Sequence, residues 1–381
     1  MDTRDRVRQI VRDEGFEPVR IARADVLAGA REAALAALEA GRLAGMRWMD
    51  RDWIIRSTDP QQFLPGARSV VLAAMPYLRD EEEPLDDASR GRIARYARGR
   101  DYHRVFEKRL RRAARAISAE FDAGARATVD YGPLLERPLA ARAGMGWLGK
   151  STMLLAPGLG PWVLLGAIAT TLDLAPDPPV HKSCGACTRC IVACPTGAIA
   201  PGGGAVDSRL CISYHTIENR GPIPRELRAS FGDWIFGCDD CLDSCPVGAG
   251  NRAGDEALAP ATIEDERPRL APLLRLDESS FREQFRGRAI MRAKRDGFLR
   301  NVCIALGNVG RIDDLPALAG ALDDDSALVR GHAAWAVGQL ADRCGVAAQA
   351  ARMLRHRLER EPEAWVREEL EAALAKADKE R

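Results

Sequence analysis

Two short runs of cysteine constrain this chain more than any other feature. The first run is Cys184-x2-Cys187-x2-Cys190-x3-Cys194-Pro195, and the second is Cys238-x2-Cys241-x3-Cys245-Pro246, with a lone Cys211 between them. In ferredoxins with two clusters, three cysteines of a run hold one cubane, and the fourth, ahead of proline, ligates the other cluster. The spacing therefore predicts two 4Fe-4S clusters.

The same pattern divides the eight thiolates into two sets of four. The first cluster is assigned Cys184, Cys187, Cys190 and Cys245. The second run lacks its first cysteine, so the upstream Cys211 is needed to complete the other set. The second cluster is assigned Cys194, Cys211, Cys238 and Cys241.

Zinc and disulfides are the alternative uses of closely spaced cysteines. A structural zinc ion takes two CxxC pairs and leaves no role for the extra cysteine and proline of each run. Disulfides need an oxidising compartment, but the chain begins with a polar helical pattern and its longest apolar stretch, residues 160–169, is shorter than the roughly 20 residues of a membrane span. We therefore expect a cytoplasmic protein without a membrane segment. Cys303 and Cys344, in apolar helical stretches, are expected to be structural thiols.

The N-terminal part alternates strand-like and helical patterns. Apolar runs at residues 69–75, 127–130 and 162–165 predict strands, and residues 104–121 predict a helix. We expect an α/β or α+β domain over residues 1–175. The proline cluster at Pro176, Pro178 and Pro179 indicates a linker into a ferredoxin-like module over residues 176–250.

The remainder of the chain, residues 251–381, has a helical and partly repetitive pattern. The segment from Asn301 to Gly307 is echoed 31 residues later by the segment from His332 to Gly338. Two helices per unit at about this period indicate a HEAT-like repeat, with a degenerate third unit near Val366. Such repeats present extended surfaces to macromolecules, so we expect this domain to contact a large partner. The predicted fold class is multidomain α+β.

Arginine is concentrated in two stretches, although the net charge of the chain is only +1. One stretch lies between Arg90 and Arg115, and the other lies between Arg282 and Arg300. Solvated helix faces explain such runs in an arginine-rich chain. The sharper interpretation is a phosphate-binding surface, because the guanidinium fork matches phosphate oxygens.

Two further blocks carry polar side chains between apolar segments. The block from Val129 to Arg137 places Asp130 at the end of a predicted strand and Glu136 at the start of the next helix. The block from Ala143 to Thr152 is a glycine-rich loop that contains Lys150 and Ser151. Such a loop allows the backbone to approach a large ligand, but its glycines can equally serve tight turns.

In combination these blocks resemble the epoxyqueuosine reductases, which complete queuosine in tRNA. The resemblance extends from about Arg51 to Leu340. Its motifs occur in order: residues 56–60, 64–70 and 96–103, the Asp130 block, the glycine-rich loop, the first cysteine run, residues 211–218, the second cysteine run and the repeat that contains Trp335.

The resemblance implies a cobalamin-dependent reductase whose N-terminal domain holds base-off cobalamin and receives electrons through the two clusters. The implied substrate is the epoxide on the modified wobble base in a tRNA anticodon stem-loop, and Asp130 would be the proton donor. The implied cobalamin contacts are Arg56, Tyr96, His103, Lys150, Ser151 and Ser213. We also expect an external electron donor, such as flavodoxin or ferredoxin, and a monomer.

Three places depart from the pattern of this family. His215 and Tyr131 stand where leucine and threonine or serine are expected, and Val247-Gly248 replaces Trp-Asn after the last cysteine and proline. All eight cluster ligands are intact.

Two other functions remain as alternatives. One is a corrinoid-dependent reductive dehalogenase, which usually has a twin-arginine export signal and needs no helical repeat. The other is a non-catalytic iron–sulfur protein that transfers electrons or binds RNA.

Overall fold

A computed structural model describes residues 2–81, 86, 88–130, 132–250 and 254–378. The chain divides into two compact units, and neither unit is continuous in sequence. Unit 1 contains residues 1–80, 99–209 and 239–259, and unit 2 contains residues 81–98, 210–238 and 260–381. These units do not coincide with the three consecutive ranges expected from the sequence.

Unit 1 is built on a four-stranded antiparallel sheet with the order β1-β2-β7-β4. The strands are β1 (Val19–Arg23), β2 (Ser69–Pro76), β4 (Ala125–Val129) and β7 (Val163–Thr170). Three of them confirm the predicted strands, and β1 was not predicted. An antiparallel sheet makes this an α+β domain.

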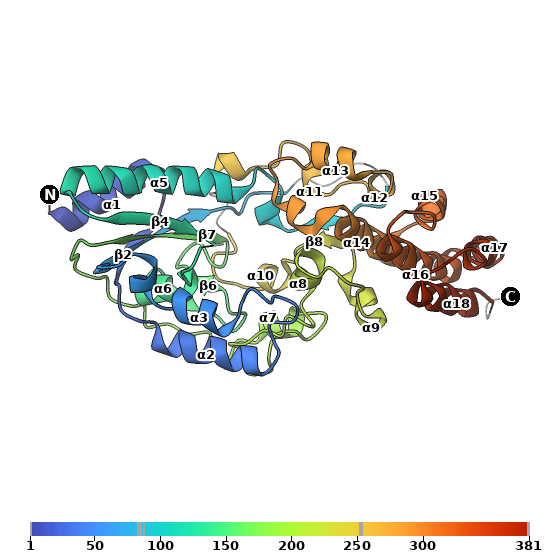
Figure 1. Cartoon of the computed structure of the whole chain (residues 1–381), viewed down its shortest axis with the longest axis horizontal. Helices are drawn as coiled ribbons and strands as arrows, with labels where there is room; N and C mark the ends of the chain where they lie inside the picture. Colours follow the sequence, from blue (N-terminus) through green and yellow to red (C-terminus); the bar gives the residue numbers. More distant parts are fainter. Residues whose placement is uncertain (1, 82–85, 87, 131, 251–253, 379–381) are drawn as a thin grey trace. The chain divides into compact units, whose positions relative to one another are not determined.

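Helices cover both faces of this sheet, as Figure 1 shows. On one face lie α1 (Thr3–Asp13) and α5 (Tyr102–Phe121), which confirms the predicted helix. Gly166 of β7 faces α5, and a Cβ at this position would lie 2.5 Å from the Phe106 ring. On the other face, α6 (Glu136–Arg142) packs on alternate residues of β2 and β7, including Leu72 and Ala167. Strands buried on both faces explain why β2 is an unbroken apolar run.

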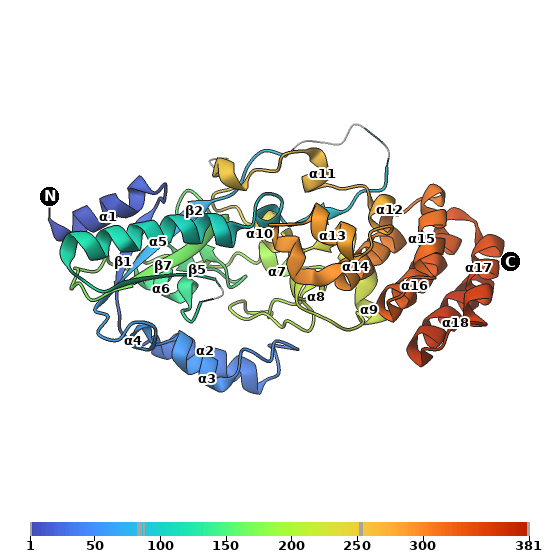
Figure 2. The same cartoon turned by 45° about the horizontal axis from the view of Figure 1, so that its top comes forward.

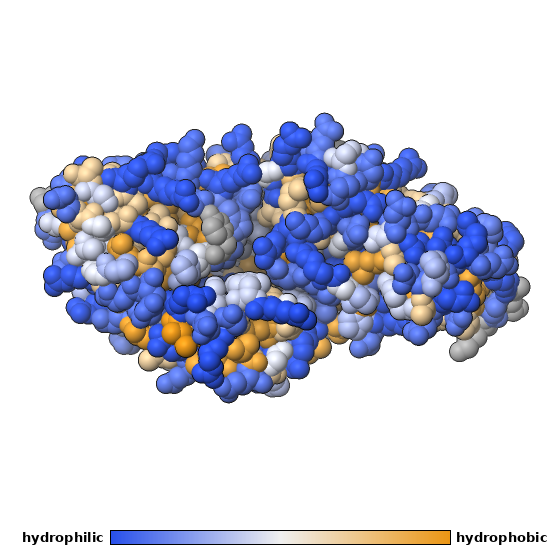
Figure 3. All heavy atoms as spheres, viewed as in Figure 1, coloured by the Kyte–Doolittle hydropathy of each residue, from blue (hydrophilic) through white to orange (hydrophobic). Residues whose placement is uncertain are grey.

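The smaller elements of unit 1 surround this sandwich. They are α2 (Ala28–Glu39), α3 (Arg51–Ser57), α4 (Pro60–Phe63), β5 (Trp147–Leu148), β6 (Leu154–Leu155), α7 (Arg189–Ala193), η3 (Glu256–Leu258) and α10 (Asp240–Asp243). Apolar side chains gather on the surface of the α2 and α3 region in Figure 3, where Trp48 is 48% exposed. α2 itself has no fully buried residue.

Unit 2 contains the helical repeat. Its repeat helices are α14 (Lys294–Val309), α15 (Leu315–Ala321), α16 (Ala327–Cys344), α17 (Ala347–Leu358) and α18 (Ala364–Asp378). α16 packs between α14 and α18, as Figure 2 shows. This arrangement confirms the predicted helical C-terminal region.

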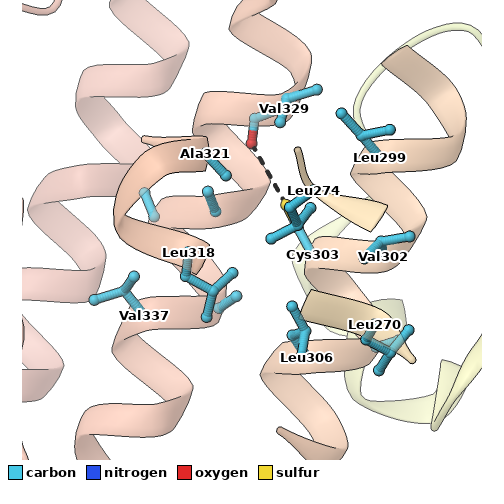
Figure 4. Close-up of a cluster of buried hydrophobic side chains, with 14 of the residues drawn as sticks. Leu270, Leu274, Leu299, Val302, Cys303, Leu306, Leu318, Ala321, Val329 and Val337 are labelled. Atoms are coloured by element: carbon cyan, nitrogen blue, oxygen red, sulfur yellow. Dashed lines mark hydrogen bonds between the residues drawn. The ribbon is translucent and has the colours of Figure 1, made fainter. Parts of the chain in front are cut away.

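A glycine on one repeat helix accommodates a tryptophan from the next. A Cβ on Gly307 of α14 would lie 2.3 Å from the Trp335 ring of α16, and a Cβ on Gly331 of α16 would lie 2.3 Å from the Trp365 ring of α18. Only glycine allows so close an approach. The core between these helices is apolar and includes Cys303, whose side chain is fully buried (Figure 4). This burial confirms Cys303 as a structural thiol.

The remaining elements of unit 2 pack around the first repeat helix. They are β3 (Arg92–Ile93), η1 (Arg95–Ala97), α8 (Ile212–Ile217), α9 (Arg225–Arg228), η2 (Ala229–Phe231), β8 (Trp234–Phe236), α11 (Ile263–Glu266), α12 (Leu270–Leu273), α13 (Glu278–Gln284), η4 (Ala289–Ala293) and η5 (Ile312–Asp314). α8, η2 and β8 contact α14. Residues from the predicted ferredoxin-like range therefore share a core with the repeat. Across the described parts of both units, no helix is long and apolar enough to cross a bilayer.

Candidate active site

Asp130 lies at the end of β4 in a strained turn. Its φ is +44°, a left-handed conformation that costs free energy for a residue with a side chain. The Gly132 N–H donates to the Val129 carbonyl, and a Cβ on Gly132 would lie 1.4 Å from Thr128 Oγ1. The next loop is fixed by a hydrogen bond from the Leu135 N–H to the Ser57 carbonyl. This local packing points Asp130 out of the sheet edge, with its side chain 60% exposed.

The first turn of α5 supplies the partners of this carboxyl. Tyr102 donates its hydroxyl hydrogen bond to Asp130 Oδ2 at 2.5 Å, and His103 Nε2 lies 3.2 Å from the same oxygen. His103 Nδ1 lies 2.7 Å from Asp101 Oδ1, and Asp101 caps α5. The result is a hydrogen-bonded row of Asp101, His103 and Asp130, with Tyr102 beside it.

Electrostatics in this row favour a charged pair. Burial opposes protonation of His103, but hydrogen bonds to Asp101 and Asp130 outweigh it and raise the imidazole pKa to about 9. Burial of Asp130 by the surrounding protein raises its pKa, but hydrogen bonds from His103 and Tyr102 outweigh burial. The pKa of Asp130 is therefore held below its ordinary value. The solvent exposure of Asp130 agrees with an ionised carboxylate. At neutral pH the proton of the pair therefore resides on His103.

A hairpin carries the next pair of predicted site residues. β5 and β6 pair through Trp147 with Leu155, and the turn between them presents Lys150 and Ser151. Two glycines of this loop are needed for close packing: a Cβ on Gly144 would lie 2.0 Å from the Pro178 carbonyl oxygen, and one on Gly146 would lie 2.3 Å from that of Leu155. The approach of a ligand to this loop stays a prediction.

The four cysteines assigned to the first cluster line one hollow in unit 1. It is lined by Lys150, Ser151, Leu155, Cys184, Cys187, Arg189, Cys190, Cys245 and Pro246. Burial and then the charge of the neighbouring thiolates raise the pKa values of Cys190 and Cys245. Among the described residues no three His, Cys, Asp or Glu side chains converge on a single ion. The four cysteines instead line one hollow, and a cubane is held by four thiolates at its corners.

The hairpin of β5 and β6 contacts both the hollow lined by cysteines and the segment that follows Asp130. Lys150 Nζ donates to the Gly185 carbonyl in the first cysteine run at 2.8 Å. Arg137, one residue after Glu136, lies 3.5 Å from the Thr152 carbonyl in the same turn. α6 also packs against β5 and β6. One short hairpin therefore contacts both the cysteine hollow and the helix that follows Asp130.

The other assigned cysteines are divided between the units. Cys194 and Cys241 belong to unit 1, whereas Cys211 and Cys238 belong to unit 2. Cys194 Sγ accepts a hydrogen bond from the Ala198 N–H at 3.3 Å. The assignment of this second set rests on spacing.

The other predicted cobalamin contacts are dispersed. Arg56 lies exposed in the last turn of α3, next to the Ser57 carbonyl that fixes the Asp130 loop. Tyr96 and Ser213 belong to unit 2, where Tyr96 contacts the Phe236 ring with centroids 6.4 Å apart. The structure brings His103 together with Asp130, and Lys150 together with Ser151.

The three departures from the family pattern have different settings. Tyr131 lies outside the described residues. His215 is 5% exposed in unit 2, with Nδ1 at 3.1 Å from the Asn219 amide. Gly248 packs against the backbone of Gly160, where a Cβ would lie 2.3 Å from the Gly160 nitrogen. Gly248 is therefore required by packing within unit 1.

Most of the arginines in the two basic stretches are neutralised by ion pairs. These pairs include Arg90 with Glu264, Arg92 with Asp233, Arg98 with Glu81, Arg109 with Asp255, Arg112 with Glu14, Arg288 with Asp265, Arg292 with Glu218 and Arg295 with Asp324. Arg300 is buried and donates to the carbonyls of His215, Asn219 and Gly221. Many guanidinium groups of the two stretches therefore pair with carboxylates from distant segments, and phosphate binding by these stretches stays a prediction.

Comparison with known proteins agrees with these features. Residues 57–131 match the family "Epoxyqueuosine reductase QueG, DUF1730", residues 183–248 match a 4Fe-4S double cluster binding domain, and residues 288–375 match HEAT repeats. An epoxyqueuosine reductase of Xanthomonas campestris is 41% identical, with 89% of this chain and 96% of the relative aligned. The chain belongs to the epoxyqueuosine reductase family.

Other members give the same result. An epoxyqueuosine reductase of Vibrio cholerae is 37% identical, with 92% of this chain and 95% of the relative covered. A crystal structure of an epoxyqueuosine reductase with an epoxyqueuosine-modified tRNA-Tyr stem loop has a TM-score of 0.90, 29% identity and 98% coverage of both chains. A Bacillus subtilis member with a TM-score of 0.87, 28% identity and 98% coverage of both chains was solved with its catalytic aspartate loop swung out of the active site. The chain is thus an oxidoreductase with a 4Fe-4S double cluster domain.

Sequence reasoning identified Asp130 and His103 but not all of their neighbours. It missed Asp101, Tyr102 and the burial of Glu136. All three lie in blocks that were already recognised, directly beside His103 or six residues after Asp130. The contact of Tyr102 with Asp130 depends on the packing of α5 beside β4, which no local pattern reveals.

Proposed function

We propose that this chain removes the epoxide oxygen of epoxyqueuosine in tRNA to give queuosine, with Asp130 delivering the proton. The observation that carries the proposal is the row of Asp101, His103 and Asp130 in the block that matches the family. A proton delivered to the epoxide oxygen accelerates breaking of the C–O bond, because it neutralises the negative charge that develops on that oxygen. Asp130 is exposed and can reach a bound base, and His103 can resupply it because Nε2 lies 3.2 Å away.

For the clusters we propose the two sets of cysteines assigned from their spacing. The hollow lined by Cys184, Cys187, Cys190 and Cys245 supports the first set, and the double cluster family match, which spans all eight residues, supports both. An external low-potential donor such as flavodoxin or ferredoxin would supply the electrons. Action on tRNA places the reaction in the cytoplasm, and we propose a monomer.

Cobalamin is the cofactor that we propose between the clusters and the epoxide. When bound, it supplies the low-potential cobalt centre that reduces the substrate. Lys150 and Ser151 would hold it beside the first cluster, because both line the cysteine hollow. Arg56 would lie near the Asp130 loop, and Tyr96 and Ser213 stay proposed contacts on the basis of the family resemblance. Both nitrogens of His103 already face carboxylates, so this residue is better suited to carry a proton than to ligate cobalt.

For tRNA binding we propose the exposed face of α5 together with the helical repeat. Arg104, Lys108 and Arg115 are exposed at spacings of four and seven residues, which places them on one side of the helix. Replacing Arg104 and Lys108 by glutamine should weaken stem-loop binding and reduce its salt dependence. Arg111→Gln on the same helix is the matched control, because Arg111 is paired with Glu107.

The deciding experiment is anaerobic incubation of the reconstituted protein with cobalamin, a chemical reductant and epoxyqueuosine-containing tRNA, followed by nucleoside mass spectrometry. Queuosine should form only with cobalamin, and Asp130→Asn should lower the rate by about 10²–10⁴-fold. Asp122→Asn is the control, since Asp122 also has a positive φ of 49° but ends α5. Loaded protein that makes no queuosine would refute the proposal. It would favour the dehalogenase alternative if halogenated substrates reacted, or the non-catalytic one if cobalamin did not bind.

A further inference from the structure

Glu136, the first residue of α6, has a buried carboxyl oxygen that the proposed mechanism does not yet use. Its Oε1 is covered and has no hydrogen-bond partner among the described residues. Burying an ionised carboxylate without such partners is costly, whereas the protonated form is tolerated. This setting raises the pKa of Glu136 to about 8, first through burial and then through the charge of Asp130. Near neutral pH this side chain therefore holds a proton.

The groups that act on Glu136 come from a small part of unit 1. Asp130 disfavours its anion, while Arg137 and the backbone N–H groups of Asp130 and Glu136 favour it. Of the strands packed on α6, only β1 carries titratable side chains, Arg20 and Arg23. At the start of α5, Tyr102 and His103 contact Asp130, and Asp101 contacts the other nitrogen of His103. Asp130 thus has a protonated imidazole 3.2 Å from its Oδ2 and interacts electrostatically with a second, protonated carboxyl, that of Glu136.

The stoichiometry of the reaction requires two protons. Removing the epoxide oxygen as water breaks two C–O bonds, forms two O–H bonds and one C=C double bond between the two ring carbons, and consumes two electrons and two protons. The external one-electron donor supplies the electrons through the clusters. Asp130 carries no proton before the reaction, since it is ionised. His103 can supply one of the two protons, and a second protonated group is needed to supply the other.

Resting on the proposed function, we infer that Glu136 is a positioning residue that stores the second proton beside Asp130 and returns it to that carboxylate during turnover. After the transfer Glu136 is an anion stabilised by Arg137 and by the two backbone N–H groups, and it regains its proton from solvent. The competing explanation is mechanical: Glu136 would anchor the Asp130 loop through those N–H groups without transferring a proton.

Glu136→Gln separates the two roles. Glutamine keeps an acceptor oxygen for the backbone but has no transferable acidic proton. The variant therefore still anchors the Asp130 loop, but it can no longer store and transfer a proton. Single-turnover rates of the reduced holoenzyme with an epoxyqueuosine-modified stem loop should be measured between about pH 6 and 10. We expect the variant to be slower by about tenfold or more and to lose the decline of rate that the wild type shows near pH 8. Glu136→Asp should restore part of the rate, and Glu120→Gln, at an exposed pair with Arg6, should change neither quantity.

Infrared titration of the wild-type protein adds a readout without turnover. The carbonyl band of a protonated carboxyl should be present at pH 7, disappear near pH 8 and be absent from Glu136→Gln. If this band is missing in the wild type, or if the variant keeps the pH profile of the wild type, the inference is overturned and the anchor explanation holds. Wild-type protein that forms no queuosine at any pH would overturn the proposed function itself, and the inference with it.

Discussion

His103 Nε2 lies 3.2 Å from Asp130 Oδ2, so an imidazole from α5 and the carboxylate that follows β4 share one proton. Asp101 holds the opposite imidazole nitrogen at 2.7 Å and fixes the ring. Two carboxylates around one imidazole explain why its pKa is raised to about 9 in spite of burial. The pair is therefore charged at neutral pH.

Replacing His103 should reveal this charge as a pH-dependent stability. The folded pKa of about 9 lies above the ordinary 6.5, so the stabilisation is fully present below pH 6.5 and is lost as the pH rises through about 9. His103→Gln should lower the free energy of unfolding by at most about 3 kcal/mol at pH 6 and by little at pH 10. Urea unfolding at several pH values measures this. The exposed His181→Gln is the control, and a destabilisation that grows with pH would contradict the assignment.

Cys245 tests whether the second run supplies a ligand to the first cluster. It lines the same hollow as Cys184, Cys187 and Cys190, although more than fifty residues separate it from them in sequence. Cys245→Ser should reduce iron in the purified protein from about eight to about four atoms per chain. Iron analysis with electron paramagnetic resonance checks the loss. Cys344→Ser, outside both runs, should retain all the iron, and equal iron in both variants would argue against Cys245 as a ligand.

Gly307 tests the packing of the repeat helices. Gly307→Ala places a Cβ 2.3 Å from the Trp335 ring, so α14 and α16 must shift, and we expect a loss of about 1–3 kcal/mol. Gly320→Ala in α15 is the matched control, because nothing lies within 4 Å of its added methyl group and it should gain about 0.5–1 kcal/mol. Thermal unfolding followed by circular dichroism compares them. Equal changes in stability for the two variants would mean that helix propensity, and not the contact with Trp335, determines the effect of Gly307→Ala.

A buried ion pair connects α9 to the last repeat helix. Arg228 donates to both oxygens of Glu369 at 2.9 and 2.8 Å, and their side chains are 2% and 8% exposed. Glu369→Gln should cost about 3–5 kcal/mol, because it leaves a buried guanidinium without its counter-charge. The exposed pair of Arg355 and Asp378 provides the comparison, and Asp378→Asn should cost less than about 1 kcal/mol. Denaturant unfolding measures both variants. Equal losses of stability would contradict the larger contribution expected of the buried pair.

Much of this protein could be predicted from local patterns. Period-two and continuous apolar runs gave β2, β4 and β7, and helical periodicity gave α5 and the repeat helices. The short strand β1 was missed because Arg20 and Arg23 interrupt its apolar residues. The sequence pattern does not show which arginines are paired, because carboxylates such as Glu264 and Asp255 reach them from segments far along the chain.

The sequence by itself determined the cluster chemistry and the family, because thiolate spacing and ordered motifs are properties of neighbouring residues. Only the tertiary structure decided the charge of each site group. Asp130 is ionised because His103 and Tyr102 from another element donate to it, and Glu136 keeps its proton because packing covers Oε1. Two carboxyl side chains six residues apart, Asp130 and Glu136, thus have opposite protonation, since a carboxyl responds to the solvent and charges around it and not to its place in a motif.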